Sequence, residues 1–371
     1  MGELALGITI VATAIQLIYW VGIFSRLAWY RPEKEVKNAN PEQASVSIII
    51  CARNESENLT KNLDRFLNQK YRSFEIIVVN DASTDNTEKV LLDFQAKSSI
   101  LRIVNLHGST PPGKKAALER GIQTARFDIV LLSDADCAPA SDYWLAMMAA
   151  NLGLGFDIAL GYGPYYTAPG FLNAFIRFET TFSAIHYLSF ALAGFPYMGV
   201  GRNLAYRKSL FEQTGGFRSH RDVASGDDDL FVNAAAHRRN TTIVLEPAAF
   251  VYSEPKRSWQ GYYHQKSRHL TTGRKYKVLH QIMLGGFSAS HGLHYLGLFA
   301  VLLFLPDQAP AAFFCYAVRI GVVAYVYSRI LVLLNDRSLQ PWIPFFDLVY
   351  LIYYFVFAPT LFIGRNHKPW K

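Results

Sequence analysis

Residues 46–56 read VSIIICARNES, a short apolar run rich in β-branched residues that gives way to polar ones. This pattern predicts a buried β-strand followed by a turn. A second run of the same character, FEIIVV, occupies residues 74–79. The sequence around these runs predicts helices at 57–68, 84–97 and 114–124, and further strands at 101–105 and 129–132. Strands that alternate with helices predict an α/β fold, with a mostly parallel sheet covered on both faces.

Polar residues directly follow three of these strands. The first strand leads into Ala52-Arg-Asn-Glu55, the second into Asn80-Asp81, and the fourth into Ser133-Asp134-Ala-Asp136. Because such sheets bind ligands at the carboxyl ends of their strands, these residues are candidates for a functional site. No glycine-rich phosphate-binding motif follows the first strand, which argues against a Walker ATPase and a Rossmann dehydrogenase.

Asp134 and Asp136 carry the clearest chemical signal. A single acidic residue at a strand end can be a helix cap, which is our expectation for Asp85. Two alternating carboxylates after a buried strand instead repel each other, by about 4 kcal/mol for charges 4 Å apart at an effective dielectric of 20. A divalent cation removes that repulsion, and oxygen ligands suit Mg²⁺ or Mn²⁺ shared with substrate phosphates.

The sequence resembles the family 2 glycosyltransferases, which have the GT-A fold. The resemblance covers about residues 46–270 and rests on pieces in the family's order: VSIIICARNES, VVNDASTDNT at 78–87, PGKKAAL at 112–118, LLSDADC at 131–137, GVGRNLAYRKSLFEQTGGF at 199–217, SGDDDLF at 225–231 and QKSRH at 265–269. It implies a Rossmann-like GT-A domain over residues 42–255. The chain looks most like membrane-bound members such as ceramide glucosyltransferase and the cellulose and hyaluronan synthases.

This resemblance implies a nucleotide-diphosphate sugar as the donor. Ala52 and Glu55 would line the base and ribose pocket, and Asp81 would accept a hydrogen bond from the base. A carboxylate fits the N3–H donor of uracil, which favours a UDP-sugar. Lys114 would lie near the nucleotide, with Lys115 as a solvated neighbour. Asp134 would contact the ribose or a metal-bound water, and Asp136 would bind the metal. Arg268 would bind a phosphate.

An inverting transfer also needs a base for the acceptor hydroxyl, and the resemblance places it in SGDDDLF. In the family's Glu-Asp pattern the second acid is the base. That residue is Asp228 here, with Asp227 in the Glu position. The alternative is that the acids cap the following helix, which we favour for Asp229. Crowded acids raise each other's pKa, which suits a base that works near neutral pH.

The family's last motif, Gln-x-x-Arg-Trp, is altered in this sequence. Gln265 and Arg268 are present, whereas His269 stands where the family has Trp. Gln265 would contact the acceptor or the diphosphate, and an alternative for Arg268 is a charge at the membrane interface. The Trp packs near the acceptor sugar in the family, so His269 leaves acceptor identity and chain elongation open.

The charges divide the chain into a globular middle and apolar flanks. Charged residues make up 18% of the chain, against roughly 25% in soluble domains, and residues 1–30 and 278–371 hold only 11 of them. This excludes a wholly soluble enzyme, a disordered chain and a fibrous repeat. The net charge of +8 includes seven Lys and Arg residues at 256–277, just before an apolar stretch. Basic residues in this position indicate the cytoplasmic side of a membrane. The positive charge therefore does not indicate a nucleic-acid partner. Three scattered cysteines fit a reducing compartment.

The apolar flanks predict membrane helices. We expect an N-terminal transmembrane anchor at 1–30, basic and aromatic interfacial helices at 256–283, about three membrane segments within 284–364 (284–305, 311–334 and 343–363), and a basic tail at 365–371. The apolar residues 169–195 fit either the interface or the core. Strict alternation puts the tail outside, whereas its charge favours the inside. Pro344 and Pro359 fit an interfacial or re-entrant last segment, and the sequence leaves this conflict open.

These features predict an inverting, metal-dependent glycosyltransferase in a bacterial cell membrane, with its catalytic domain in the cytoplasm. Its partners would be a nucleotide-sugar donor, a lipid or glycan acceptor, and membrane lipids. We expect transfer to a lipid or lipid-linked acceptor. One alternative is a processive polysaccharide synthase, for which four membrane segments are few. Another is an inactive GT-A-like scaffold subunit, against which the acidic set Asp134, Asp136 and Asp228 argues.

Overall fold

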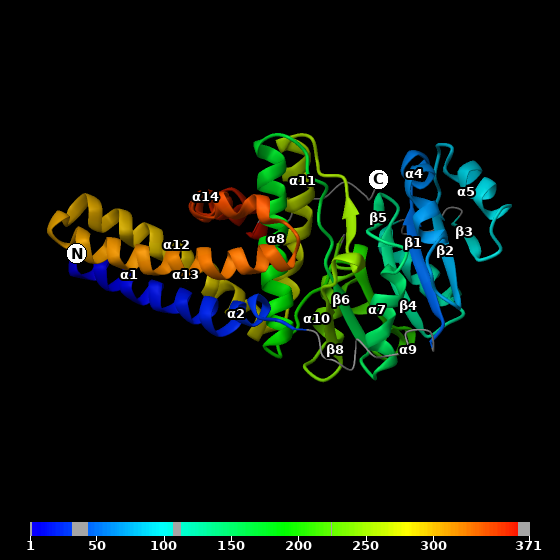
Figure 1. Cartoon of the computed structure of the whole chain (residues 1–371), viewed down its shortest axis with the longest axis horizontal. Helices are drawn as coiled ribbons and strands as arrows, with labels where there is room; N and C mark the ends of the chain where they lie inside the picture. Colours follow the sequence, from blue (N-terminus) through cyan, green and yellow to red (C-terminus); the bar gives the residue numbers. More distant parts are fainter. Residues whose placement is uncertain (1, 32–43, 107–112, 224, 363–371) are drawn as a thin grey trace.

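The computed structural model describes residues 2–31, 44–106, 113–223 and 225–362. Within these residues a seven-stranded sheet has the order β3-β2-β1-β4-β7-β6-β8 (Figure 1). Its strands are β1 Val46–Ala52, β2 Phe74–Asp81, β3 Leu101–Leu106, β4 Ile129–Asp134, β6 Ile158–Gly161, β7 Leu204–Arg207 and β8 Thr241–Val244. Among these described strands only β7 runs antiparallel to its neighbours, β4 and β6. The predicted mostly parallel sheet is confirmed.

The continuous apolar run of β1 reflects burial on both faces of the sheet. Ile48 and Ile50 pack on the layer that contains α4 (Ser56–Leu67), α5 (Thr87–Gln95) and α7 (Trp144–Gly153). Ile49 packs on the opposite layer, which contains α6 (Lys114–Thr124). Because neither face of the strand meets water, the sequence shows no polar alternation.

A small second sheet shapes the turn that follows β4. In it β5 (Cys137–Pro139) pairs antiparallel with β9 (Val251–Ser253), and Cys137 lies opposite Ser253. Only two residues separate β4 from β5, so both ends of the Asp134–Asp136 turn are held in strands. Two short helices, α9 (Lys208–Gln213) and α10 (Asp229–Ala235), complete the domain.

Two helices, α8 (Phe171–Leu192) and α11 (Trp259–Leu270), lie between the sheet domain and the long apolar helices at the two ends of the chain (Figure 1). Most of α8 is buried, so the central apolar residues of 169–195 belong to the core, whereas Phe171 and Phe195 near the two ends of this stretch are exposed. The ion pair between Lys266 and Glu179, 2.5 Å long, joins α11 to α8. A 3₁₀ turn, Thr271–Lys275, follows α11 and leads into the next long helix.

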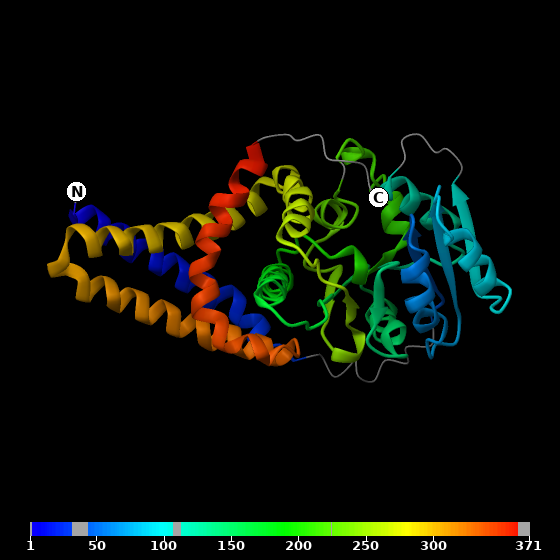
Figure 2. The ribbon, with the colours of Figure 1, turned by 90° about the horizontal axis from the view of Figure 1, so that it is seen from above.

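Within the described residues, four helical segments are long and apolar enough to cross a membrane: Leu4–Ala28, Val278–Phe304, Pro306–Leu333 and Arg337–Pro359. The first consists of α1 (Gly2–Leu17), a π-helical stretch (Ile18–Phe24) and α2 (Ser25–Ala28). The others contain α12 (Val278–Phe304), α13 (Ala309–Leu333) and α14 (Ile343–Phe362). Figure 2 shows α1, α12 and α13 running alongside one another, whereas α14 lies across them. The predicted basic tail, 365–371, lies outside the described residues.

Candidate active site

The carboxyl ends of β1, β2 and β4 meet at one edge of the sheet. The parallel pairing sets Ala52 beside Asn80 and Cys51 beside Asp134. Asp81 ends β2 and Asp134 ends β4, so these two acids flank β1 on either side. The structure thus brings together the strand ends that the sequence singles out.

The turns after β1 and β2 are tied to each other by short polar side chains. Asp85 accepts hydrogen bonds from the backbone N–H groups of Ser56 (3.2 Å) and Thr87 (3.0 Å), the first residues of α4 and α5. The backbone N–H of Glu55 donates to the Thr87 hydroxyl at 2.9 Å. Asp85 is therefore a capping residue, and it orients the turn that carries Glu55.

Asp81 and Glu55 differ in their surroundings. Asp81 is buried, and its Oδ2 lies 3.6 Å from Nη1 of Arg53. Burial raises the pKa of Glu55, which a hydrogen bond from Asn58 opposes and the charges of Asp136 and Asp134 reinforce. Glu55 thus lies within electrostatic range of the acidic pair, on the β1 side of the site.

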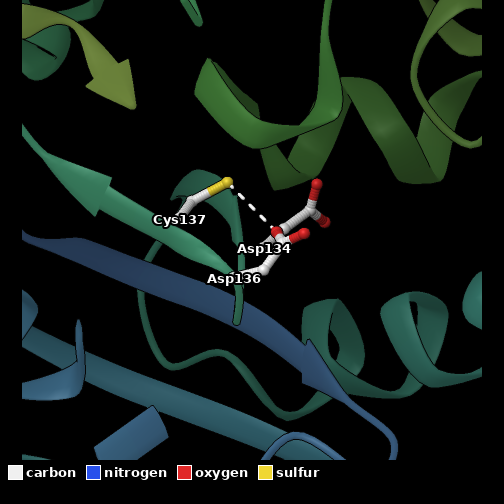
Figure 3. Close-up of side chains that lie close together, drawn as sticks. All are labelled: Asp134, Asp136 and Cys137. Atoms are coloured by element: carbon white, nitrogen blue, oxygen red, sulfur yellow. Dashed lines mark hydrogen bonds between the residues drawn. The ribbon is translucent and has the colours of Figure 1, made fainter. Parts of the chain in front are cut away.

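The acidic pair after β4 forms a group with the geometry of a metal site. Ligand atoms of Asp134, Asp136 and Cys137 all lie within 4.8 Å of one another (Figure 3). Burial and the negative charge of the adjacent Asp134 raise the pKa of Asp136. This is expected when two carboxylates lie close together and nearby cations do not fully neutralise them. The pair therefore fits a divalent cation that accepts oxygen ligands.

Cys137 is a poor candidate for a third ligand. Its buried thiol lies 3.4 Å from Oδ1 of Asp136 and donates to it. Burial and the charges of Asp136 and Asp134 raise its pKa well above the usual value, which favours the neutral thiol. A neutral thiol does not bind hard cations such as Mg²⁺ well, which leaves the two carboxylates as the ligands from this turn.

Lys114, the first residue of α6, bridges two parts of the site. Its ammonium lies 2.8 Å from Oδ1 of Asp134 and 3.2 Å from Oδ2 of Asp227. Burial alone would lower the pKa of Lys114, but Asp134, Asp227 and Asp228 raise it well above its usual value. The lysine is therefore charged, and it connects the acidic pair to the acidic run at 227–229.

The three acids of this run have three different environments. Despite burial, Lys114 lowers the pKa of Asp227. Asp229 accepts from Tyr276 at 2.7 Å and from Thr272, both in the segment after α11, and from the backbone N–H of Leu230. Its contacts are therefore structural, and its position is the first residue of α10.

Asp228 is the N-cap of α10, and its pKa is raised into the neutral range. Its Oδ1 accepts from the backbone N–H of Asp229 at 2.8 Å, and its Oδ2 from that of Gly201 at 2.7 Å. Burial and the charges of Asp227 and Asp229 raise its pKa to about 7. A carboxylate held in place with a near-neutral pKa meets the requirements of a general base.

The residues of the altered last motif project from α11. The side chain of Gln265 donates to the hydroxyl of Tyr165 at 3.2 Å. The backbone carbonyl of Arg268 accepts from Ser225 at 3.0 Å, so α11 is tied to the loop just before the acidic run. His269 is exposed, and nearby cations include Lys266 and Arg268.

Arg202 belongs to the site, and the sequence analysis missed it. Its guanidinium stacks over the ring of Tyr165, 4.6 Å from the centroid, and donates to the carbonyl of Gly163. Its charge acts on both Asp134 and Asp136. A Cβ at Gly163 would collide with Nε of Arg202, so the glycine makes room for this side chain. The sequence signal is the GVGRN run at 199–203, which begins one of the pieces on which the family resemblance rests.

Lys115 corrects a second expectation. It is not a solvated neighbour, because its ammonium donates to the backbone carbonyls of His220 (2.6 Å) and Val223 (2.8 Å). These two bonds hold the loop that precedes the acidic run. The two consecutive lysines of α6 therefore have different roles. Lys114 neutralises acids in the site, and Lys115 anchors a loop beside it.

Residues 47–215 match the family described as "Glycosyl transferase family 2". The chain is 28% identical over 256 residues to "Probable glycosyltransferase YdaM" of Bacillus subtilis, and the alignment covers 64% of this chain and 57% of that protein. It is 33% identical over 125 residues to poly-beta-1,6-N-acetyl-D-glucosamine synthase of Staphylococcus epidermidis, covering 32% of this chain and 29% of that protein. The alignments thus span less than two thirds of either relative.

Among solved structures, the chain is similar to the mannosyltransferase PcManGT from Pyrobaculum calidifontis, determined in complex with GDP-Man and Mn²⁺. The TM-score is 0.60 over 94% of this chain and 98% of that chain, at 18% sequence identity. This likeness confirms the predicted GT-A fold.

Proposed function

We propose that residues 47–215, which match the family 2 glycosyltransferases, form a domain that carries out an inverting transfer dependent on Mg²⁺ or Mn²⁺. The donor is a UDP-sugar, and the acceptor is a lipid or lipid-linked hydroxyl at the cytoplasmic face of a bacterial membrane. The observation that carries the proposal is Asp228, a partly buried carboxylate with a pKa of about 7 beside a lysine-linked acidic pair.

In this reaction Asp228 accepts the proton of the acceptor hydroxyl. The hydroxyl oxygen forms a bond to the anomeric carbon on the face opposite the leaving group. The bond between that carbon and the phosphate oxygen breaks, and its electron pair goes to the departing nucleoside diphosphate. The configuration at the anomeric carbon is inverted because the reaction is a single displacement.

The choice of Asp228 over Asp227 rests on their contacts. Asp227 is ion-paired with Lys114 at 3.2 Å, which lowers its pKa and makes it a weak base. Asp228 keeps a pKa of about 7, and the Gly201 N–H orients its carboxylate. Asp229 is engaged by Thr272 and Tyr276, which supports a structural role.

On the donor side, Asp134 and Asp136 hold the metal. A divalent cation bound there supplies electrostatic stabilisation of the departing diphosphate. Asp81 accepts from the uracil N3–H, and Ala52 and Glu55 line the base and ribose pocket, at the β1–β2 edge. Lys114, Arg202 and Arg268 add positive charge for the phosphates. PcManGT holds GDP-Man and Mn²⁺, so a GDP-sugar is the competing donor in the test.

The position of α11 supports a membrane-borne acceptor. This helix carries Gln265 and His269, and it lies in the layer between the sheet domain and the membrane helices (Figure 1). An acceptor hydroxyl that arrives from the membrane surface would therefore meet α11 on its way to Asp228. The seven basic residues at 256–277 support the cytoplasmic side.

A processive polysaccharide synthase is the second candidate. It is favoured by the similarity to poly-beta-1,6-N-acetyl-D-glucosamine synthase, although the aligned region is only 32% of this chain. An inactive scaffold is disfavoured by the network that joins Asp134, Lys114 and Asp227, because such a charged cluster has no evident packing role.

The deciding experiment uses membranes that contain the full chain, radiolabelled UDP- and GDP-sugars, and either Mg²⁺ or Mn²⁺. We expect metal-dependent release of UDP and transfer of label to the lipid fraction. Asp228→Asn is the matched control, since it keeps the shape of the side chain. A chain that binds UDP but releases none from any donor would be an inactive scaffold, and use of GDP-sugars alone would refute uracil as the nucleobase that Asp81 recognises.

A further inference from the structure

The last apolar helix, α14, does not run with the other membrane helices. In Figure 2, the axes of α1, α12 and α13 run roughly side by side, and α14 crosses them at the end nearer the sheet domain. Figure 1 agrees, since α14 lies beside the layer formed by α8 and α11. Length and hydropathy alone would allow this helix to cross a membrane.

Both ends of α14 contact that same layer. Near its start, the ring of Phe346 lies 4.9 Å from Phe178 of α8. Near its end, the ring of Phe357 lies 5.3 Å from Tyr263 of α11 and stacks on it. The two phenylalanines are eleven positions apart, which corresponds to a helical rise of about 16 Å. A membrane-spanning helix would carry its second end that far away from the layer.

The middle of α14 also lies close to the layer formed by α8 and α11. The ring of Tyr350 lies 4.4 Å from Phe182 of α8, and the ring of Tyr354 lies 5.5 Å from His291 of α12. The helix therefore passes from α8 to α12 and on to α11 without moving away from the catalytic side.

A buried charge network fixes this crossing. Asp347 of α14 pairs with Arg319 of α13, with N–O distances of 2.6 and 3.1 Å. Tyr295 of α12 donates to the same carboxylate at 2.5 Å, and Arg319 also donates to Gln16 of α1 at 3.1 Å. Because a lone charge in such surroundings is very unfavourable, all four helices are held at this point.

Among the described side chains of α14, at 343–359, the free face is apolar. Its exposed large side chains are Phe345, Leu348, Ile352, Phe355 and Val356. A helix that lies in a membrane interface normally turns a polar face to the headgroups. Here α8 and α11 cover the opposite face, so α14 needs no polar face and can turn its free face to the hydrocarbon.

We propose that α14 lies in the plane of the bilayer on the catalytic side, embedded with its free face against lipid, and that the described chain crosses the bilayer three times. The turn between α12 and α13, at Pro306–Gln308, then lies on the side opposite the catalytic domain. Both ends of α14 lie on the catalytic side, where basic residues such as those of the sequence at 365–371 are favoured.

The test compares three variants of the full chain, each with one introduced cysteine, in a Cys315→Ser background that keeps the buried Cys51 and Cys137. The substitutions are Ser99→Cys in the catalytic domain, Asp307→Cys between α12 and α13, and Asn366→Cys after α14. Each variant is treated with a membrane-impermeant maleimide in intact and in permeabilised cells.

We expect the thiol at position 366 to be labelled like the thiol at position 99 and unlike the one at position 307, whichever way the catalytic domain faces. If α14 spans the membrane, position 366 will instead match position 307, and the proposal is overturned. The proposal expects residue 366 to be accessible from the catalytic side of the membrane. A thiol at position 366 that stays unlabelled even in permeabilised cells, while positions 99 and 307 react, would therefore also contradict it. Because labelling is independent of turnover, this result stands apart from the proposed glycosyl transfer.

Discussion

The ammonium of Lys114 lies 2.8 Å from the carboxylate of Asp134. The same ammonium is 3.2 Å from Asp227, so one side chain connects the end of β4 to the acidic run at 227–229. Lys114 also lowers the pKa of Asp228, against the stronger effects of burial and the neighbouring acids. A cation that binds at Asp134 and Asp136 will therefore also influence the protonation of Asp228.

The first prediction concerns the metal. Asp136→Ala removes a carboxylate from the pair that follows β4, so turnover should fall below detection, and chelation should do the same to the parent protein. Activity is measured as metal-dependent release of UDP. Asp93→Ala, an exposed acid on α5, is the matched control and should remain active. Full activity of the parent protein in excess EDTA would show that no metal is needed.

The second prediction concerns the base. Asp228→Asn should lower kcat by 10²-fold or more, while UDP binding measured by calorimetry stays near that of the parent protein. Asp227→Asn should weaken the Lys114 network and have the smaller effect on kcat. An inactive Asp227→Asn protein together with an active Asp228→Asn protein would mean that Asp227 is the base.

The pKa of Asp228 gives this prediction a pH dependence. The base acts when ionised, and its pKa is raised to about 7. kcat/KM should therefore rise tenfold per pH unit below 7 and level off above it. Lys114→Met removes a charge that lowers this pKa, so the rise should move to higher pH. A profile that is flat from pH 5 to 9 would contradict the assignment.

The third prediction concerns the orientation of the catalytic domain. Seven basic residues between Lys256 and Lys277 favour the cytoplasmic side. A cysteine at Ser99, exposed on the sheet domain, should resist a membrane-impermeant maleimide in intact cells and react after permeabilisation. Ready labelling in intact cells would place the domain outside.

The fourth prediction concerns the product. His269 presents a smaller aromatic face than the Trp of processive relatives, and a lost aromatic contact weakens the hold on a glycan by on the order of 1 kcal/mol, roughly fivefold. We expect a lipid that carries one added sugar, and His269→Trp should increase longer products. Chromatography of the radiolabelled product checks this, and a ladder of lipid-free polymer from the parent protein would rule it out.

The fifth prediction concerns stability. Gly121 of α6 packs against β1, and a Cβ there would lie 2.6 Å from Cγ2 of Ile49 and 3.0 Å from Cγ2 of Val79. Gly121→Ala should therefore destabilise the domain by about 1–3 kcal/mol through overpacking. Gly153→Ala on α7 meets nothing within 4 Å and is the matched control. Thermal unfolding in detergent should show a lower Tm for the first variant only.

Sequence alone was enough to predict the first half of the sheet and the acids at its edge. Strands β1 to β4 are long apolar runs between helices with clear spacing, and their pattern arises from local burial. Strands β5 to β9 have three or four residues each, too few for a readable period, so only the structure shows them. The sequence singles out Asp134 and Asp136, which share one acidic motif, and Asp228, which lies in another, as candidate site residues.

The relations between distant residues depend on tertiary packing. Nothing local in the sequence states that Lys114 bridges Asp134 and Asp227, that Arg202 stacks on Tyr165, or that Lys115 anchors a loop. The course of α14 is the clearest case. A spanning helix and an in-plane helix can have the same length and hydropathy. What sets the direction of α14 is its packing on α8 and α11 and the pairing of Asp347 with an arginine 28 residues earlier in the chain.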